Sequence, residues 1–373
     1  MAVNSKEDNK VGAKKIYTES GIKGKTFITC AACLTLHTEA NEWANYILQK
    51  QDSNLSITKT PSNADNIIIL SCQVTDLAIF NDLNIVVKYS KLYPGKAIFV
   101  GGCLAQRLDI PLLEDVNRIE HLKKDYQEIK KNIVNFEKPF WGKERNDDNN
   151  PFEHSSPIRI GSGCSGKCEY CTIKHTRGVP TTLSPIKLID NIKKTKNDIV
   201  LIADNISSKQ INDYGEISKA LDKPLSLRNV EPINIVKSKT ILLELSSRGL
   251  LKVVHSPIQS MDSKILESMN RSYEAMLEAV HIMEQLSLYG TKIATNIIKD
   301  YKGEQQSFDT VYEIFDYVRW NPYWDNAWDF KKASIRWNYY FPWKNEHTTE
   351  SMNRSYEAMQ AAFVYPCCAG KFP

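Results

Sequence analysis

Cys164-Ser165-Gly166-Lys167-Cys168-Glu169-Tyr170-Cys171 is the stretch around which the rest of the sequence is organised. It places three thiols at C-x3-C-x2-C spacing, with an aromatic residue directly before the last one. Cysteine thiolates are the usual ligands of iron–sulfur clusters, and four of them complete the ligation of a 4Fe-4S cluster. Three thiolates leave one iron open, as a catalytic zinc site leaves a position for its substrate. The stretch therefore predicts a 4Fe-4S cluster on Cys164, Cys168 and Cys171 with one open iron.

A zinc site with His175 as the fourth ligand is the alternative interpretation of the same stretch. The cluster is favoured because a strand-like run precedes the cysteines and alternating strand-like and helix-like segments follow them.

Length and composition bound the class of protein. A chain of 373 residues exceeds one compact core, so we expect two domains with extensions. The net charge of +4 is compatible with an RNA partner without requiring one. No apolar run reaches the ~18 residues that span a bilayer, and nine cysteines without an apolar leader favour a reducing compartment. We therefore expect a cytoplasmic monomer that does not enter a membrane.

Short β-rich runs at residues 26–29, 67–71 and 97–100 predict three strands in the first part of the chain. Helix-like segments lie between them, at 40–48 and 77–92. This alternation is typical of βαβ units with a parallel sheet.

A cysteine follows each of these three strands: Cys33, Cys72 and Cys103. Loops at the carboxyl ends of parallel strands meet at one edge of the sheet, so the three thiols are expected to come together there. The alternative interpretation is that each cysteine is a small buried core residue, because free cysteine is often part of a core. Three in corresponding positions favour a second cluster on three thiolates. Cys30 stays open as an alternative to Cys33.

The alternation resumes after residue 151. Strands are expected at 157–161, 199–204, 226–229, 253–257, 291–298 and 334–341, and helices include 186–194 and 264–288. Six βα units predict a partial (βα)6 barrel, whose chemistry lies at the carboxyl ends of its strands. We therefore predict an α/β fold with an N-terminal open parallel α/β sheet domain followed by this barrel.

Composition also predicts the boundaries of these parts. The expected parts are a disordered polar arm at 1–22, the first domain at 23–140 with its last helices at 111–140, a linker at 141–151, the barrel at 152–345 and a short tail at 346–373.

The motifs resemble those of the radical S-adenosylmethionine methylthiotransferases. The resemblance covers roughly residues 25–310 and is most specific in the C-x3-C-x2-C loop, in LSCQVTDLA around Cys72 and in VGGCLAQ around Cys103. It implies two 4Fe-4S clusters, one binding S-adenosyl-L-methionine at the loop cysteines and an auxiliary one on Cys33, Cys72 and Cys103. It also implies an external electron donor and a sulfur source.

The residues after the loop narrow the implied substrate. Lys174-His175 before Arg177-Gly178 resembles the archaeal and eukaryotic branch that adds a methylthio group to carbon 2 of N6-threonylcarbamoyladenosine beside the tRNA anticodon. His175 and Arg177 are therefore candidate substrate-binding residues, the first against a base and the second as a fork on a phosphate or carboxylate. Alternatively, both residues order the cluster loop.

Four polar residues at predicted strand ends are candidate contacts of S-adenosyl-L-methionine by the same resemblance: Asp204, Asn205, Arg228 and Gln259. No residue is assigned as catalytic. In the fifth-strand loop the family has Gly-Phe-Pro-Gly-Glu, whereas this chain has Asp300-Tyr301-Lys302-Gly303-Glu304. Losing that glycine and proline is expected to change the backbone freedom of the loop.

The C-terminal part departs from the family. Methylthiotransferases end in a small β-barrel domain that binds RNA, and the roughly 30 residues after the predicted barrel are too few for one. The decapeptide ESMNRSYEAM at 267–276 recurs at 350–359, which is too few copies for a solenoid.

Several other functions stay open at this stage. One alternative is methylthio transfer to another tRNA adenosine or to a ribosomal-protein aspartate. Another is a different radical enzyme that acts on a peptide or small metabolite. From another class, the chain would be an inactive cluster-containing scaffold that binds RNA.

Overall fold

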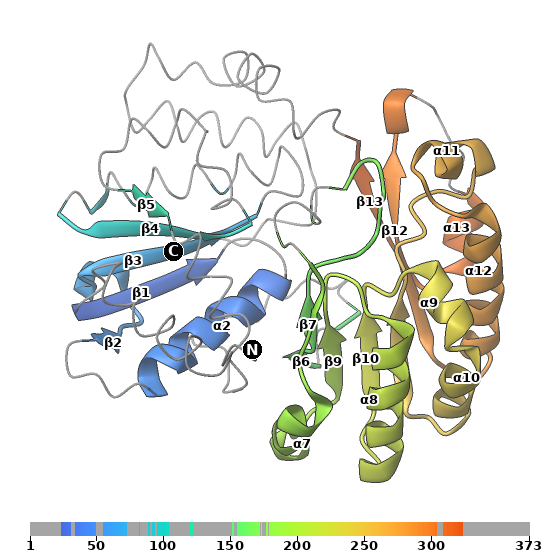
Figure 1. Ribbon diagram of the computed structural model, residues 1–373, viewed down its shortest axis with the longest axis horizontal. Coiled ribbons are helices and arrows are strands. Elements are labelled where there is room, and N and C mark those ends of the chain that lie inside the picture. Colours follow the sequence, from blue (N-terminus) through green and yellow to red (C-terminus); the bar gives the residue numbers. More distant parts are fainter. Residues whose placement is uncertain are drawn as a thin grey trace, which may run out of the picture.

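The computed structural model contains two parallel β-sheets that meet at helix α2 (Leu34–Gln49) (Figure 1). This helix packs on strands β1 (Gly24–Cys30) and β3 (Asn66–Ser71) of the first sheet and on β6 (Ser156–Arg159) of the second. The structure describes residues 24–30, 34–49, 55–72, 82, 89, 92–93, 95–103, 119–121, 151–152, 155–171, 173, 177, 179–303 and 309–323.

The first sheet has the strand order β2-β1-β3-β4-β5, and all its described pairings are parallel. Its strands are β1 (Gly24–Cys30), β2 (Leu55–Ile57), β3 (Asn66–Ser71), β4 (Ala97–Gly102) and β5 (Ile119–His121). The three strands predicted from the sequence are confirmed as β1, β3 and β4. Every residue of β3 is buried, as expected for a parallel strand covered on both faces.

One expectation for this part is wrong, and another is covered by only three described residues. Residues 111–140 were expected to be helical, but β5 lies among them and pairs with β4. Main-chain hydrogen bonds to β4 form this strand, so the side-chain pattern was a poor guide to it. Of the helix expected at 77–92, the structure describes Asp82, Tyr89 and Leu92, all helical.

The second sheet has six parallel strands in the order β13-β12-β11-β10-β9-β6. They are β6 (Ser156–Arg159), β9 (Ile199–Ile202), β10 (Leu225–Arg228), β11 (Leu251–His255), β12 (Lys292–Lys299) and β13 (Tyr317–Pro322). A two-stranded antiparallel ribbon, β7 (Gly161–Ser162) with β8 (Thr181–Thr182), stands beside β6. The predicted fold class is therefore confirmed.

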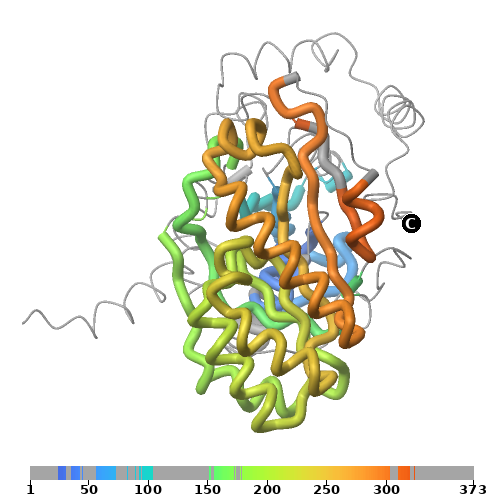
Figure 2. Tube along the Cα trace, turned by 90° about the vertical axis from the view of Figure 1, so that its right-hand side faces the viewer, coloured from blue at the N-terminus to red at the C-terminus, as the bar shows by residue number. Residues whose placement is uncertain are grey.

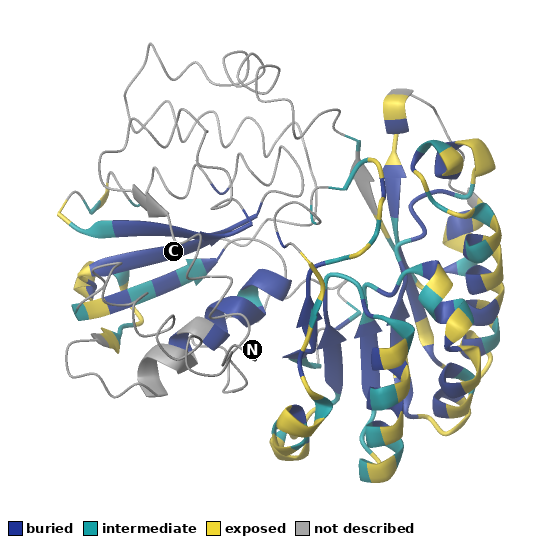
Figure 3. Cartoon of the chain, viewed as in Figure 1, coloured by how far each residue is buried: buried dark blue, intermediate teal, exposed yellow. Residues whose placement is uncertain are grey.

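Helices cover the outer face of the second sheet (Figures 1 and 2). They are α7 (Pro185–Lys194), α8 (Ser208–Leu221), α9 (Pro232–Lys237), α10 (Lys239–Ser247), α11 (Ser263–Ser268), α12 (Tyr273–Ser287) and α13 (Asp309–Ile314). Most residues of these strands are buried, and the outward faces of the helices carry many of the exposed residues (Figure 3).

Strand residues of the second sheet alternate between two apolar clusters. Leu201 and Leu227 belong to the large core shared with the helices. Val200, Ile202 and Val253 point to the opposite, inner face, where they pack with other apolar side chains. This period of two places one side of each strand inside the partial barrel.

Two elements of this sheet and its helices differ from the sequence prediction. The helix expected at 264–288 is interrupted between α11 and α12, because Asn270 adopts a left-handed backbone with φ of 57° and the Ser272 side chain caps α12. The sixth strand is β13, whereas the segment expected to form it, 334–341, lies outside the described residues. The other strands and α7 agree with the sequence analysis.

The expected arm at 1–22, most of the linker at 141–151 and the tail at 346–373 also lie outside the described residues. Within the described residues, no helix combines the length and apolar character needed to cross a membrane.

Gly102 offers a test of this packing. Its φ is +80°, and a Cβ there would lie 2.7 Å from the backbone oxygen of Ser71. We expect Gly102→Ala to lower the free energy of unfolding by about 3 kcal/mol, because backbone strain and a backbone clash add together. Gly249, with φ of +69° and open space around it, is the matched control, and Gly249→Ala should cost about 1 kcal/mol. Equal losses in urea unfolding would show that the clash is absent.

Candidate functional site

The three-cysteine loop starts directly after β7, at the carboxyl edge of the second sheet. Cys168 is buried, and Cys164 and Cys171 are partly exposed. Gly166 sits between two of the sulfurs: a Cβ there would lie 3.1 Å from the Sγ of Cys164 and 3.9 Å from that of Cys168. The Gly166 amide donates to the Cys164 Sγ at 3.2 Å. The loop thus curves round its glycine, with sulfurs close to the backbone.

Burial keeps the thiols of Cys164 and Cys171 protonated when no metal is bound. Burial raises the pKa of Cys164. Burial, aided by the neighbouring Cys168, Cys164 and Asp204, raises the pKa of Cys171 to about 12. Metal binding would displace these protons, since thiolates are the ligands.

The residues present fit a cluster by their donor set, which is three thiols of one loop with an amide donor on one sulfur. Among the described residues, no group of three or more His, Cys, Asp or Glu side chains is already arranged round a common metal position. The ligand roles of Cys164, Cys168 and Cys171 therefore stay predictions.

The altered fifth-strand loop packs against the cluster loop. Asp300, where the family has glycine, has a φ of 56°, so it keeps the left-handed backbone that glycine permits. Tyr301 is buried, and its ring meets that of Tyr170 edge-on at 6.3 Å. This turn therefore supports the aromatic residue before Cys171.

Asp204 and Asn205 lie beside the cluster loop, after β9. A carboxylate oxygen of Asp204 accepts from the Gly163 amide at 2.7 Å and from the Ser162 hydroxyl at 3.0 Å. The Asn205 side-chain oxygen accepts from the Asn234 amide group at 3.3 Å, and its hydrogen bond to Cys164 acts to lower the pKa of that thiol. Asp204 thus holds the residues directly before the loop, and Asn205 contacts both the loop and Asn234.

The other two candidate cofactor contacts lie at neighbouring strand ends. Arg228, the last residue of β10, donates to the Thr35 hydroxyl of α2 at 3.0 Å. Gln259, with φ of 70°, bridges to β12 through backbone hydrogen bonds to Asn296 and Ile298. All four candidates share the expected carboxyl edge, and their cofactor contacts stay predictions.

Register places the cysteines of the first sheet. Ser71 pairs with Gly102 across β3 and β4, so the buried residues Cys72 and Cys103 directly after them occupy equivalent positions. Cys30, the last residue of β1, pairs with Leu70, two residues before Cys72, so Cys30 is not equivalent to Cys72. Cys33 lies outside the described residues.

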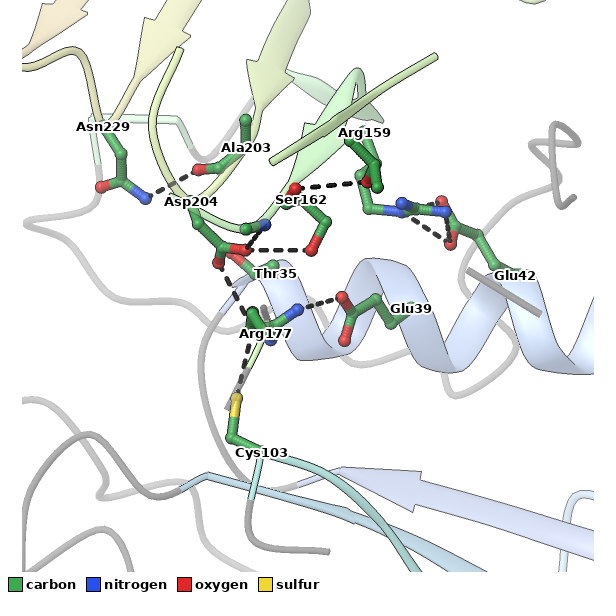
Figure 4. A network of polar contacts seen from close by, with 12 residues as sticks. Thr35, Glu39, Glu42, Cys103, Arg159, Ser162, Arg177, Ala203, Asp204 and Asn229 are labelled. Atoms are coloured by element: carbon green, nitrogen blue, oxygen red, sulfur yellow. Dashed lines mark hydrogen bonds and ion pairs between the residues drawn. The ribbon is translucent and has the colours of Figure 1, made fainter. Parts of the chain in front are cut away.

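Arg177 joins the two sheets (Figure 4). Its side chain is 3% exposed, and its Nε is 3.2 Å from the Cys103 Sγ and 3.3 Å from an Asp204 carboxylate oxygen. Its Nη1 pairs with Glu39 of α2. Burial acts to lower the pKa of Arg177, but Asp204, Cys103 and Glu39 outweigh it and raise that pKa. The cation therefore stays charged between the end of β4 and the end of β9.

These contacts favour a role for Arg177 in ordering the cluster loop over a role in binding substrate, because Glu39 and Asp204 already pair with its guanidinium. Its substrate role stays a prediction, and His175 lies outside the described residues.

A second buried ion pair lies nearby, and the sequence analysis missed both of its members. Arg159 of β6 meets the Glu42 carboxylate of α2 through Nε and Nη2 at 2.8 Å (Figure 4). A charged residue between Ile158 and Ile160, at the end of β6, was the available signal.

His255 was also missed, since a lone histidine in a strand carries no motif. It is buried, and its Nδ1 accepts from the Asn229 amide at 3.2 Å. Burial, followed by the charge of Arg228 and then of Arg319, lowers the pKa of His255 to about 3, against an opposing hydrogen bond from Asn296. The imidazole is therefore neutral at physiological pH.

Comparison with known proteins adds to this geometry. The model of an uncharacterized protein family, UPF0004, matches residues 25–122. The tRNA-2-methylthio-N(6)-dimethylallyladenosine synthase of Bdellovibrio bacteriovorus is 27% identical over 297 residues, which are 70% of this chain and 64% of that protein. The ribosomal protein uS12 methylthiotransferase RimO of Desulforamulus reducens is 23% identical over 73% of this chain and 68% of that protein.

Among solved structures, the radical S-adenosylmethionine methyltransferase TsrM from Kitasatospora setae has a TM-score of 0.49 at 9% identity, over 74% of this chain and 70% of that chain. The chain spans less than two thirds of the length of the Bdellovibrio protein. Both sequence relatives are named for methylthio chemistry, one on a tRNA nucleoside and one on a ribosomal protein, and both are less than 30% identical to this chain. They do not single out the threonylcarbamoyladenosine branch.

The pair between Arg159 and Glu42 predicts that removing one partner destabilises the protein much more than replacing both. Glu42→Leu should lower the free energy of unfolding by about 3–5 kcal/mol, because it leaves a buried cation without its carboxylate. Adding Arg159→Met should recover most of that loss, since an apolar pair fills the space. Urea unfolding measures both, and a double variant no more stable than the single one would contradict the assignment.

His255 predicts a pH dependence of stability. Its folded pKa of about 3 lies below the ordinary 6.5, so the unfolded state binds more protons and stability falls as the pH drops below 6.5. Between pH 7 and pH 5 the loss from this group should be about 2 kcal/mol. The loss should be absent in His255→Asn, and identical pH profiles of wild type and variant would refute it.

Proposed function

We propose that this chain is a radical S-adenosylmethionine methylthiotransferase that adds a methylthio group to carbon 2 of N6-threonylcarbamoyladenosine in tRNA. The observation that carries the proposal is the 3.2 Å contact of Arg177 with the Cys103 Sγ. Arg177 follows the cluster loop, whereas Cys103 follows β4 of the other sheet. This contact supports a pair of three-cysteine sites at facing strand ends.

Cys164, Cys168 and Cys171 would hold one 4Fe-4S cluster and, at its open iron, S-adenosyl-L-methionine, and Cys33, Cys72 and Cys103 would hold the second cluster. When bound, the first would supply the electron for reductive cleavage of S-adenosyl-L-methionine, and the second the sulfur to be transferred.

The chain's own part in the reaction is placement. Ser162 and Gly163 fix the Asp204 carboxylate, and this carboxylate holds Arg177 at the end of β4. The buried ion pairs of Glu39 with Arg177 and of Glu42 with Arg159 join the two sheets, which would keep the separation of the two sites constant. Such fixing matters because a misplacement of about 1 Å can cost about 100-fold in rate.

The substrate assignment is supported by Lys174-His175-x-Arg177-Gly178, which resembles the threonylcarbamoyladenosine branch. The proposal includes tRNA as partner, an external electron donor, a sulfur source and a cytoplasmic location. It also includes the division into a first domain at 23–140 and a barrel at 152–345.

A ribosomal-protein substrate is the second candidate. It is favoured by the Desulforamulus relative, which is named for ribosomal protein uS12 and covers as much of this chain as the Bdellovibrio protein does.

One assay separates these candidates. Anaerobically reconstituted protein is incubated with dithionite, S-adenosyl-L-methionine and either tRNA bearing N6-threonylcarbamoyladenosine or ribosomal protein uS12, and mass spectrometry of the substrate reports the result. We expect a methylthio group in place of hydrogen on the nucleoside only, and none with the Cys164→Ala/Cys168→Ala/Cys171→Ala variant. Transfer to the protein alone would establish the second candidate, and failure to cleave S-adenosyl-L-methionine would favour an inactive scaffold.

The register of the first sheet predicts which cysteine completes the auxiliary site. Cys33→Ala should lower bound iron by about four per chain, because the register puts the residue equivalent to Cys72 and Cys103 beyond Cys30 in the chain. Cys30→Ala should keep its iron, since Cys30 lies two positions earlier. The reverse pattern of iron loss would assign the ligand to Cys30.

A further inference from the structure

Three successive residues between α11 and α12 contact the cluster loop; we call Met269, Asn270 and Arg271 the 269–271 segment. The Met269 carbonyl accepts from the Glu169 amide at 3.0 Å, and the Asn270 side-chain amide donates to the Lys167 carbonyl at 3.0 Å. These bonds fix the backbone on both sides of Cys168. The left-handed backbone of Asn270 lets the segment turn toward the loop.

Arg271, the third residue, reaches the sulfur itself. Its Nη1 lies 3.4 Å from the Cys168 Sγ and 3.5 Å from the Tyr170 hydroxyl, and its Nη2 donates to the Pro257 carbonyl at 2.8 Å. Its side chain is only 9% exposed. Burial acts to lower the pKa of Arg271, but Tyr170, Cys168 and Glu231 outweigh it and raise that pKa. A permanent cation therefore stands against this one sulfur.

Glu231 places an opposite charge at the same point. Its Oε1 lies 3.9 Å from the Cys168 Sγ and 3.7 Å from the Arg271 Nη1. Its side chain is 23% exposed, so water screens it more than Arg271. The sulfur of Cys168 thus faces one buried cation and one half-buried anion.

We propose that Arg271 is a positioning residue that holds Cys168 and raises the reduction potential of the cluster bound there, and that Glu231 opposes it. The inference rests on the proposed function in requiring a cluster on Cys164, Cys168 and Cys171. One-electron reduction adds a negative charge to the site, and a neighbouring cation in a region of low dielectric stabilises that charge. Hydrogen bonds and charges at ligand sulfurs are known to tune cluster potentials.

The test measures potential rather than activity. The full chain carrying Cys72→Ala and Cys103→Ala, and so only the loop cluster, is reconstituted and its iron is counted. It is then titrated with dithionite under electron paramagnetic resonance. Arg271→Gln should lower the midpoint by at least 59 mV, a tenfold change in the one-electron equilibrium constant. Glu231→Gln should raise it by a smaller amount, and Arg271→Lys, which keeps the charge, should stay within 59 mV of the parent.

The sequence offers a matched control. The recurring decapeptide contains Arg354 at the position equivalent to Arg271, and Arg354→Gln should leave the midpoint unchanged. Unchanged midpoints in both Arg271→Gln and Glu231→Gln, shifts of the same sign in those two, or an equal shift in Arg354→Gln would each overturn the inference. If Arg271→Gln holds no iron, Glu231→Gln and Arg271→Lys decide alone. A parent that binds no iron would overturn the proposed function as well, whereas a parent with about four irons and no shift overturns only the role of Arg271.

Discussion

The buried guanidinium of Arg177 is the interaction on which the arrangement of the site depends. It meets Glu39 of α2, Cys103 at the end of β4 and Asp204 at the end of β9, so the two sheets share one charged centre. A buried cation without its carboxylates costs several kcal/mol, which makes this junction strongly preferred over a looser one. The pair between Arg159 and Glu42 repeats the same principle one turn along α2.

The two predicted cluster sites share a physical design. In each, a buried arginine lies against a cysteine sulfur: Arg177 at Cys103, and Arg271 at Cys168. Both arginines are also held by a carboxylate, which keeps the buried charge paired. A fixed cation beside a ligand sulfur stabilises the negative charge of a cluster bound through thiolates. The same arrangement of cation and sulfur therefore occurs at both predicted sites.

The sequence predicted the strands and the common edge of the site because continuous apolar runs and strand-end polar residues are local signals. Cys72, Asp204 and Arg228 could be placed at strand ends from that pattern alone. The charge pairs could not, since Glu39 and Arg177 meet only when the two sheets dock. The break at Asn270 and strand β5 were missed for a similar reason, because backbone conformation and pairing decide them rather than side-chain period.

The central claim is that two separate sets of three cysteines each hold a cluster. Iron and sulfide per chain in the anaerobically reconstituted protein test it most directly, with wild type beside a variant in which Cys164, Cys168 and Cys171 are all alanine. Two clusters predict about eight irons per chain, falling to about four in the variant. About four irons falling to none would remove the auxiliary cluster, and methylthio transfer by this chain with it.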